Sequence, residues 1–165
     1  ALGAGAPIAG ATVTLWAASP AAPRELAKAQ SGTDGRFSLP ATPKAGPGAS
    51  LYLIAKGGRP TANEAAGNNP AIGLVAALGQ TPPATVTINE MTTVATVWTH
   101  NQFIEGTAIQ GNALGLKVAA GNVPNFVDLE TGGWGTTIQD SLNGKTRLKS
   151  HSAALHNRQF AYKNP

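Results

Sequence analysis

Three histidines are the side chains of this sequence best suited to acid–base or metal chemistry. They are His100, His151 and His156. The last two lie five positions apart, whereas two metal ligands on one face of a helix need a spacing of four. His100 lies near the polar end of a predicted helix, so we expect all three to be surface side chains. No Gly-x-Ser-x-Gly sequence is present to hold a nucleophilic serine. The pattern therefore predicts neither a metal centre nor a hydrolase.

The carboxylates give little more support for catalysis. Asp128 and Glu130 would project from one face if they lay on a strand. Pro124 and the glycines after Thr131 leave little room for a strand, so we interpret the pair as solvated loop residues. Asp34-Gly35 is a turn signal, and no second carboxylate lies near Asp34 in sequence to complete a calcium site. No glycine pattern matches a nucleotide-binding loop, and we expect no catalytic residues, no metal and no cofactor.

Aromatic side chains offer a different kind of site, one for stacking. Trp134 lies in the glycine-rich stretch TGGWG, and Tyr162 lies near the end of the chain. A large ring in such a loop either stacks on a sugar ring or closes over the core as a plug, and both interpretations stay open. The tail near Tyr162 is basic, because five cations follow the last acid, Asp140: Lys145, Arg147, Lys149, Arg158 and Lys163. These charges are too sparse to predict nucleic-acid binding.

The composition indicates a setting rather than a reaction. Of 165 residues, 42% are hydrophobic but only 12% are charged, about half the usual share of ~25%. A surface so poor in charge favours secreted or assembled proteins. There is no cysteine, so disulfides and thiolate chemistry are excluded. The apolar run from Ala71 to Gly79 is far shorter than the ~20 residues that span a bilayer. The start at Ala1 without Met fits a mature product after signal-peptide removal or a trimmed chain.

Alternating runs in the first third of the chain predict strands. Residues 11–17 put Ala11, Val13 and Leu15 on one face and Trp16 on the other, and residues 51–55 alternate in the same way. Further short strands are predicted at 36–39, after a hairpin turn at Asp34-Gly35, and at 85–88. The second face carries large apolar side chains that need cover: Trp16, Tyr52 and Ile54. We expect that cover from the second half of the chain.

Helix signals follow from residue 58 onward. Asn69, Pro70 and Gly79 read as the N-cap, first position and C-terminal glycine of a buried helix over 70–78. Asn89 is predicted to cap a second helix from Glu90, whose charge suits the first turn, to Phe103. The expected core face of this second helix is apolar: Met91, Val94, Ala95 and Trp98. A third helix is predicted from Asn112 to Ala120, and the segment 148–160 is interpreted as a peripheral or docked tail.

The strand region has the features of a known family. Residues 5–57 resemble the carboxypeptidase regulatory-like domain, a transthyretin-like β-sandwich, through GAPIAGATVTLW, SGTDGRFSL and LYLIAKGG. The continuation, through NNPAIGLVAALG, VTINEMTTVATVW and GLKVAAGNVPNFVD, is similar to a group of uncharacterised secreted bacterial proteins that carry this sandwich with a helical appendage. The resemblance covers about residues 5–130 and implies a non-catalytic extracellular or cell-surface role. Cysteines common in that group are missing here, and so is its apolar closing helix after Lys145.

Together these patterns predict an α+β chain. Residues 1–60, with a strand near 84–88, are expected to form a small antiparallel transthyretin-like or Ig-like β-sandwich. Residues 61–140 are expected to form a helical appendage packed on the sheet, and 141–165 a basic tail. The family pattern begins with a strand ahead of Pro7, where this chain has only ALGAGA. The resemblance therefore predicts an open sheet edge beside residues 11–17.

Three functions are consistent with the sequence. The first is a secreted or cell-surface structural or adhesion protein that assembles with itself or with a surface partner through the open strand edge. The second is a polysaccharide-binding accessory module that stacks sugars on Trp134 and Tyr162. The third is an unfamiliar hydrolase, which requires a histidine, an acid and a nucleophile to meet in one pocket.

Overall fold

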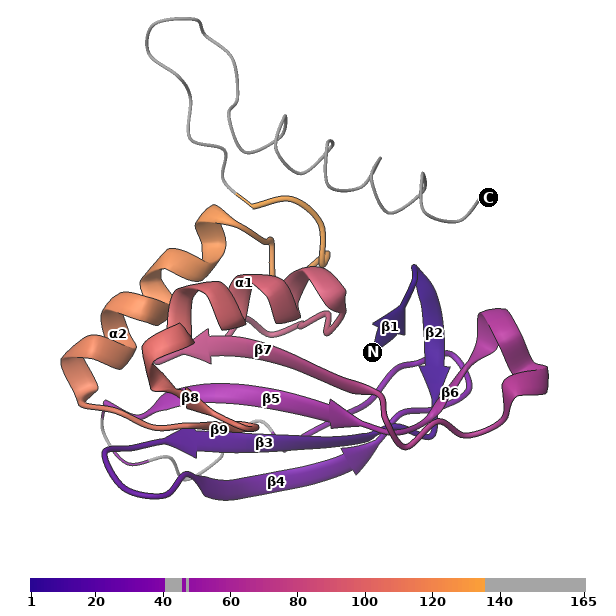
Figure 1. The fold of residues 1–165 in the computed structure, drawn as a ribbon, viewed down its shortest axis with the longest axis horizontal. Coiled ribbons are helices and arrows are strands. Elements are labelled where there is room, and N and C mark those ends of the chain that lie inside the picture. Colours follow the sequence, from indigo (N-terminus) through magenta and orange to yellow (C-terminus); the bar gives the residue numbers. More distant parts are fainter. Residues whose placement is uncertain (41–45, 47, 136–165) are drawn as a thin grey trace, which may run out of the picture.

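The computed structural model describes residues 1–40, 46 and 48–135, which fold around one antiparallel sheet with helices on one side (Figure 1). The sheet has the strand order β4-β3-β5-β7. Its strands are β3 (Thr12–Ala18), β4 (Arg24–Gln30), β5 (Ser50–Lys56) and β7 (Gly73–Gly79). The predicted α+β class is confirmed at this level.

Two cores lie on the two faces of the sheet because β3 and β5 alternate. Val13 and Leu15 point to a lower core, which Ile8, Leu53 and Ile88 also join. The upper core is lined by Tyr52 and Ile54, with Trp16 packed against it, and the helices cover it. Trp16 stacks on Tyr52 at a ring-centroid distance of 6.4 Å. The predicted need for cover over these three side chains is confirmed.

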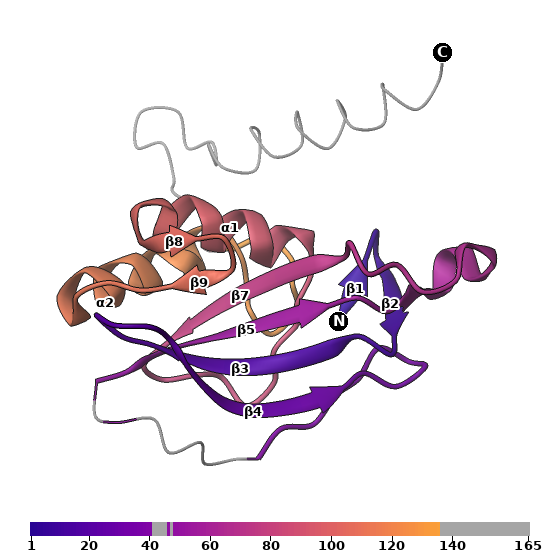
Figure 2. The same cartoon turned by 60° about the horizontal axis from the view of Figure 1, so that its bottom comes forward.

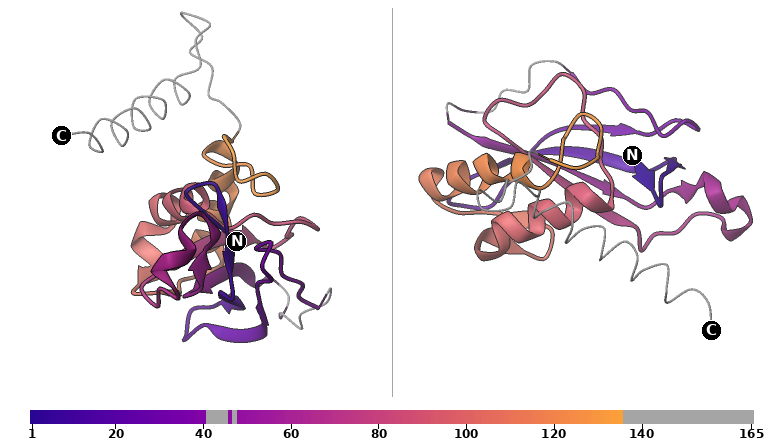
Figure 3. Two further views of the ribbon diagram at one scale, coloured as in Figure 1. Left: turned by 90° about the vertical axis from the view of Figure 1, so that its right-hand side faces the viewer. Right: turned by 90° about the horizontal axis from the view of Figure 1, so that it is seen from above.

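Shorter elements complete the fold. At the N-terminus, β1 (Leu2–Gly3) pairs with β2 (Ala6–Ala9), which pairs in turn with β6 (Arg59–Pro60); the 3₁₀ segment η1 (Thr61–Ala66) follows. This small sheet lies beyond one end of the main sheet, as Figures 2 and 3 show. A second pair joins β8 (Ile104–Glu105) to β9 (Ala108–Ile109).

Two α-helices form the upper layer. Helix α1 runs over Glu90–His100 and continues into the 3₁₀ turn η2 (Asn101–Phe103). Asn89 lies at its N-cap, where the Asn89 side chain accepts a hydrogen bond from the Thr92 amide. Helix α2 runs over Ala113–Asn122 with Asn112 at its N-cap, and η3 (Val123–Asn125) follows. Their caps explain why both helices begin where the sequence predicts.

The helix predicted over 70–78 is wrong, because this segment forms β7. Leu74, Ala76 and Leu78 enter the lower core while Ala77 enters the upper one, so both faces of the strand are buried. A run that is apolar on both faces has no period that separates strand from helix. The apparent cap Asn69 instead closes a turn, in which its side-chain Oδ1 accepts from the Ala71 amide at 3.0 Å.

The other strand predictions also need correction. Residues 36–39 and 85–88 are not assigned to strands. The polar segment 24–30, for which the sequence predicts no strand, forms β4 and pairs along β3. The edge beside residues 11–17, predicted to be open, is therefore filled from within the chain. β4 was missed because an edge strand with one thinly covered face carries mostly polar residues.

Candidate functional site

His100 is a buried side chain, not the surface histidine that the sequence predicts. Its exposed fraction is 1%, and the Thr99 hydroxyl lies 2.8 Å from its Nδ1. Burial lowers the pKa of His100 below its usual value of 6.5, because a charged ring would be desolvated there. His151 and His156 lie outside the described residues. Across residues 1–40, 46 and 48–135, no group of three or more His, Asp or Glu side chains is placed to hold a metal ion.

The carboxylates singled out in the sequence close turns. Asp128 Oδ1 accepts from the Glu130 amide at 2.9 Å, and this bond lowers the pKa of Asp128 because it stabilises the charged form. Glu130 is exposed. Asp34 accepts from the Arg36 amide at 3.0 Å, and Gly35 adopts a φ of +72° that completes the turn. This turn does not join two strands, since residues 36–39 form none. Asp34 and Asp128 thus hold loops in shape.

The core face predicted for helix α1 is correct in part. Its buried side chains are Thr92, Ala95, Thr96 and His100. Ala95 is thus in the core as predicted, and Met91 packs against the upper core. Val94 and Trp98, also predicted to lie in the core, are 60% and 70% exposed, so this half of the prediction is wrong.

The cause is the outer edge of β7, along which α1 lies. The Thr93 hydroxyl accepts from the Val75 amide at 3.0 Å, and the Thr96 hydroxyl accepts from the Ala77 amide at 2.9 Å. These side chains stand where a neighbouring strand would otherwise satisfy the amides of β7. The sequence signal is a set of threonines at helical spacing: Thr92 and Thr96 are four apart, and Thr93, Thr96 and Thr99 are three apart. The predicted core face rests only on the apolar residues between them.

The outward side of the two helices carries most of the exposed large hydrophobic residues. We call five of these side chains the helical apolar face: Val94, Val97, Trp98, Leu114 and Val118. Both helices pack their other side towards the sheet, through Ala95 in α1 and Leu116 in α2. At 100° per residue, the five side chains project away from that packed side. In the described part of the chain, the one further exposed large hydrophobic residue is Trp134.

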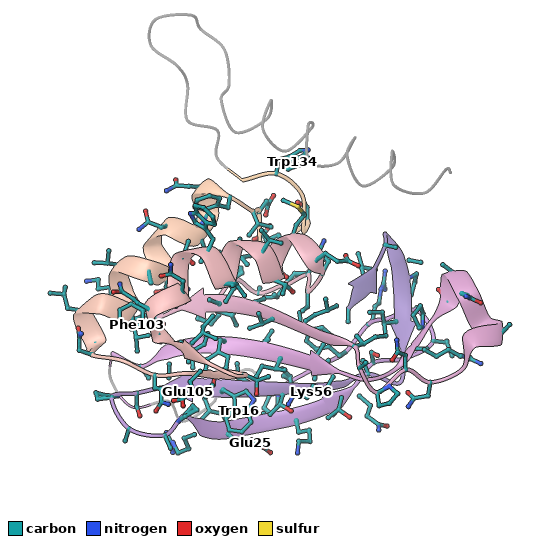
Figure 4. All side chains as sticks on the ribbon, viewed as in Figure 1. Trp16, Glu25, Lys56, Phe103, Glu105 and Trp134 are labelled. Carbon is teal, nitrogen blue, oxygen red and sulfur yellow. The ribbon has the colours of Figure 1, made fainter. Side chains whose placement is uncertain are left out.

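Trp134 is half exposed on the loop after η3, beyond the helical layer (Figure 4). An open cleft of about 730 Å³ lies beside it. The cleft has apolar lining from Leu78, Pro82 and Pro83, with Asp128 and Glu130 at its margin. The ring is 44% exposed, so part of it packs on the chain and part is free to stack. Tyr162, the second predicted stacking residue, lies outside the described residues.

The outer edge of β4 has two features that disfavour pairing with another strand. The register of the β3–β4 pair shifts between Leu15 and Trp16, which leaves Leu26 as the extra residue of a β-bulge. Glu25 and Lys28 form an exposed ion pair at 3.4 Å on the same strand. Bulges and charges are the usual protection of an edge strand. This edge is a poor site for assembly.

A groove of about 900 Å³ lies under the sheet; we call it the lower groove. Leu15, Leu51 and Leu53 of the sheet are among its lining residues, as are residues 34–40 and 82–87. These two segments contain the stretches that the sequence predicts as strands. Phe37 and Leu39 are partly buried between the exposed Arg36, Ser38 and Pro40, which is the alternation of a strand.

The helices of the described residues include none that is long and apolar enough to cross a membrane. In comparisons with known proteins, no family model matches the chain, and no curated protein or solved structure shows significant similarity to it.

Proposed function

We propose that this chain is a secreted or cell-surface, non-catalytic structural or adhesion module that associates with copies of itself through the helical apolar face. The observation that carries the proposal is the orientation of α1, which buries Thr92 and Thr96 and exposes Val94 and Trp98. Exposed apolar groups that follow one another along one side of a helix mark a contact surface more often than scattered ones do. Tryptophan is also among the residues that contribute most to binding at interfaces.

The helical apolar face is a better assembly surface than a strand edge. β4 carries a bulge and charges, and α1 covers the β7 edge through Thr93 and Thr96. On α1, the pair Val94–Trp98 has a spacing of four, as does Leu114–Val118 on α2, so each pair forms one ridge along its helix. Two such ridges on each copy suit a helix-on-helix contact, which is self-complementary under twofold symmetry.

Two further expectations belong to the same proposal. The low charge of the chain, 12% of its residues, supports a secreted or surface setting. The strand-like burial of residues 36–39 supports a transthyretin-like sandwich, because these residues lie where a second layer would pack under the sheet.

The test is sedimentation velocity over a wide range of protein concentration, with electron microscopy for fibres. We expect the native chain to associate as concentration rises, and Trp98→Gln with Leu114→Gln to raise the dissociation constant at least tenfold. Lys28→Gln on the β4 edge is the matched control and should leave association unchanged. Circular dichroism checks that each variant folds. The proposal would be refuted if the native chain stays monomeric at several hundred micromolar. It would also be refuted if Lys28→Gln weakens association while Trp98→Gln with Leu114→Gln does not.

A polysaccharide-binding accessory module is the second candidate, and the half-exposed Trp134 beside its cleft favours it. Aromatic rings bind sugars through their flat apolar faces, and the carboxylates of Asp128 and Glu130 would accept hydrogen bonds from hydroxyls. A glycan array with the native chain and with Trp134→Ala tests this function. Binding that disappears in the variant supports it, whereas absence of binding to every glycan removes it.

A further inference from the structure

We propose that the lower groove binds an extended peptide strand from another polypeptide, one with apolar side chains at every second position. The strand would lie between the segments 36–39 and 84–87 and pack on the underside of the sheet. This site is separate from the helical apolar face, which lies on the opposite side of the sheet.

The floor of the groove selects apolar side chains. Leu15, Leu51, Leu53 and Leu78 line it from three strands of the main sheet, although each is only 2–8% exposed. The partly buried Phe37, Leu39 and Val86, which pack against the same core, add to its apolar lining. In a strand lying in the groove, alternate side chains face this apolar lining and the others point away. An occupant with apolar residues at every second position therefore fits, while a uniformly polar chain does not.

The walls of the groove offer unpaired backbone groups. Within the described residues, no hydrogen bond involves the main chain of Phe37–Leu39 or of Thr85–Val86. Yet Val86 and Ile88 point inward in the alternating manner of a strand, as Phe37 and Leu39 do. Both walls thus have the side-chain pattern of strands without the hydrogen bonds of a sheet. Addition of a strand supplies such bonds in series, whereas a compact small molecule would supply one or two.

One end of the groove already shows how a chain lies between the two walls. The Ala1 ammonium group donates to the Gly35 carbonyl, next to the first wall. The Leu2 amide donates to the Ile88 carbonyl at 2.9 Å, next to the second wall. Ala1 and Leu2 therefore connect both segments through main-chain bonds, and both line the groove. The proposed peptide would make main-chain hydrogen bonds to both walls in the same way, in the part of the groove beyond Ala1 and Leu2.

Charge at the rim does not favour a strongly charged partner. Asp34 and Arg36 lie 3.7 Å apart at the groove and largely cancel each other. No other acidic or basic side chain lines the groove among the described residues, and the Ala1 ammonium group is held by the Gly35 carbonyl. The strand that fits is thus close to neutral, with small polar residues between its apolar ones.

The probe is a synthetic peptide of alternating threonine and valine, seven residues long and blocked at both ends. Its control has the same side chains but N-methyl groups at alternate positions, which remove hydrogen-bond donors from one edge of the strand. We measure binding by calorimetry, and we measure hydrogen exchange of the amides at 37–39 and 85–86. The expected result is binding with at least tenfold slower exchange at both walls, and at least tenfold weaker binding of the methylated control.

Two variants locate the site on the protein. Val86→Asp places a charge on one wall and should abolish peptide binding while circular dichroism remains native. Trp98→Gln removes an apolar side chain from the helical apolar face and should leave peptide binding unchanged. Self-association and peptide binding are therefore tested independently of each other. The proposal is overturned if the peptide does not bind at millimolar concentration, if the methylated peptide binds equally well, or if the protected amides lie in α1 and α2. The peptide comparison decides the question even if Val86→Asp does not fold.

Discussion

Replacing Thr96 with valine distinguishes the observed orientation of α1 from the one that the sequence suggests. An apolar residue in the middle of a core-facing helix would ordinarily stabilise the protein. Here the Thr96 hydroxyl is fully buried and accepts the Ala77 amide at 2.9 Å. Valine has nearly the same shape but no acceptor, so the Ala77 N–H would be left without a partner in a buried position.

The size of the effect follows from this one hydrogen bond. A buried amide that loses its partner costs about 1–3 kcal/mol. The added methyl group recovers at most about 0.8 kcal/mol through apolar burial. We therefore expect the free energy of unfolding to fall by about 1 kcal/mol, within a range of about 0.2–2 kcal/mol. For a chain of this length, a loss of about 1 kcal/mol corresponds to a drop in Tm of roughly 2–4 °C.

Thermal unfolding by calorimetry or circular dichroism measures this change. Thr12→Val is the control, because Thr12 is a half-buried residue of β3 whose hydroxyl makes no hydrogen bond within the described residues. It should change Tm by less than about 2 °C, as an ordinary surface substitution does. Hydrogen exchange at Ala77 should accelerate in Thr96→Val and stay unchanged in Thr12→Val. A Tm that rises or stays the same in Thr96→Val would refute the role of α1 as the cover of the β7 edge.

Three further predictions concern the core and one turn. Below about pH 6.5, His100 takes up a proton in the unfolded chain but resists it when folded, so Tm should fall as pH drops from 7 to 5, and His100→Gln should remove part of that slope. Tyr52→Phe deprives the Ile109 amide of its acceptor, at 3.3 Å, and should cost about 1 kcal/mol in denaturant unfolding. Gly58→Ala should cost at least about 2 kcal/mol, because its Cβ would lie 2.9 Å from backbone atoms of the chain near β2. Gly57→Ala is the matched control, because Gly57 also has a positive φ but has open space around it, so its cost should be about 1 kcal/mol. Equal losses of stability in the two variants would contradict a steric clash at Gly58.

The parts of the fold that the sequence predicts correctly depend on local rules. β3 and β5 show a clear period of two, and their larger side chains fall on the face that the helices cover. Asn89 and Asn112 cap helices at the predicted positions. These features need only neighbouring residues, so one sequence is enough to reveal them.

The incorrect predictions concern segments whose structure is determined by residues far away in the sequence. Residues 73–79 become a strand because β5 offers them an edge, although their flanking Asn69 and Gly79 resemble helix caps. The polar segment 24–30 becomes a strand because β3 pairs with it. Neither pairing leaves a mark within the segment itself. Burial of His100 and the lower groove were missed for the same reason, since each requires elements far apart in the sequence to meet.

The need for hydrogen-bond acceptors at the β7 edge does not by itself explain the helical apolar face. This need accounts for Thr93 and Thr96, whose hydroxyls accept hydrogen bonds from amides of β7. It places no constraint on Val94, Val97 or Trp98, which point away from the sheet. A helix whose only role was to cover the strand edge would carry charged or polar residues on its solvent side. The exposed edge strand β4 does carry such residues, Glu25 and Lys28. The apolar character of the outer face thus has a separate cause, and the proposed contact with another copy of the chain would supply one.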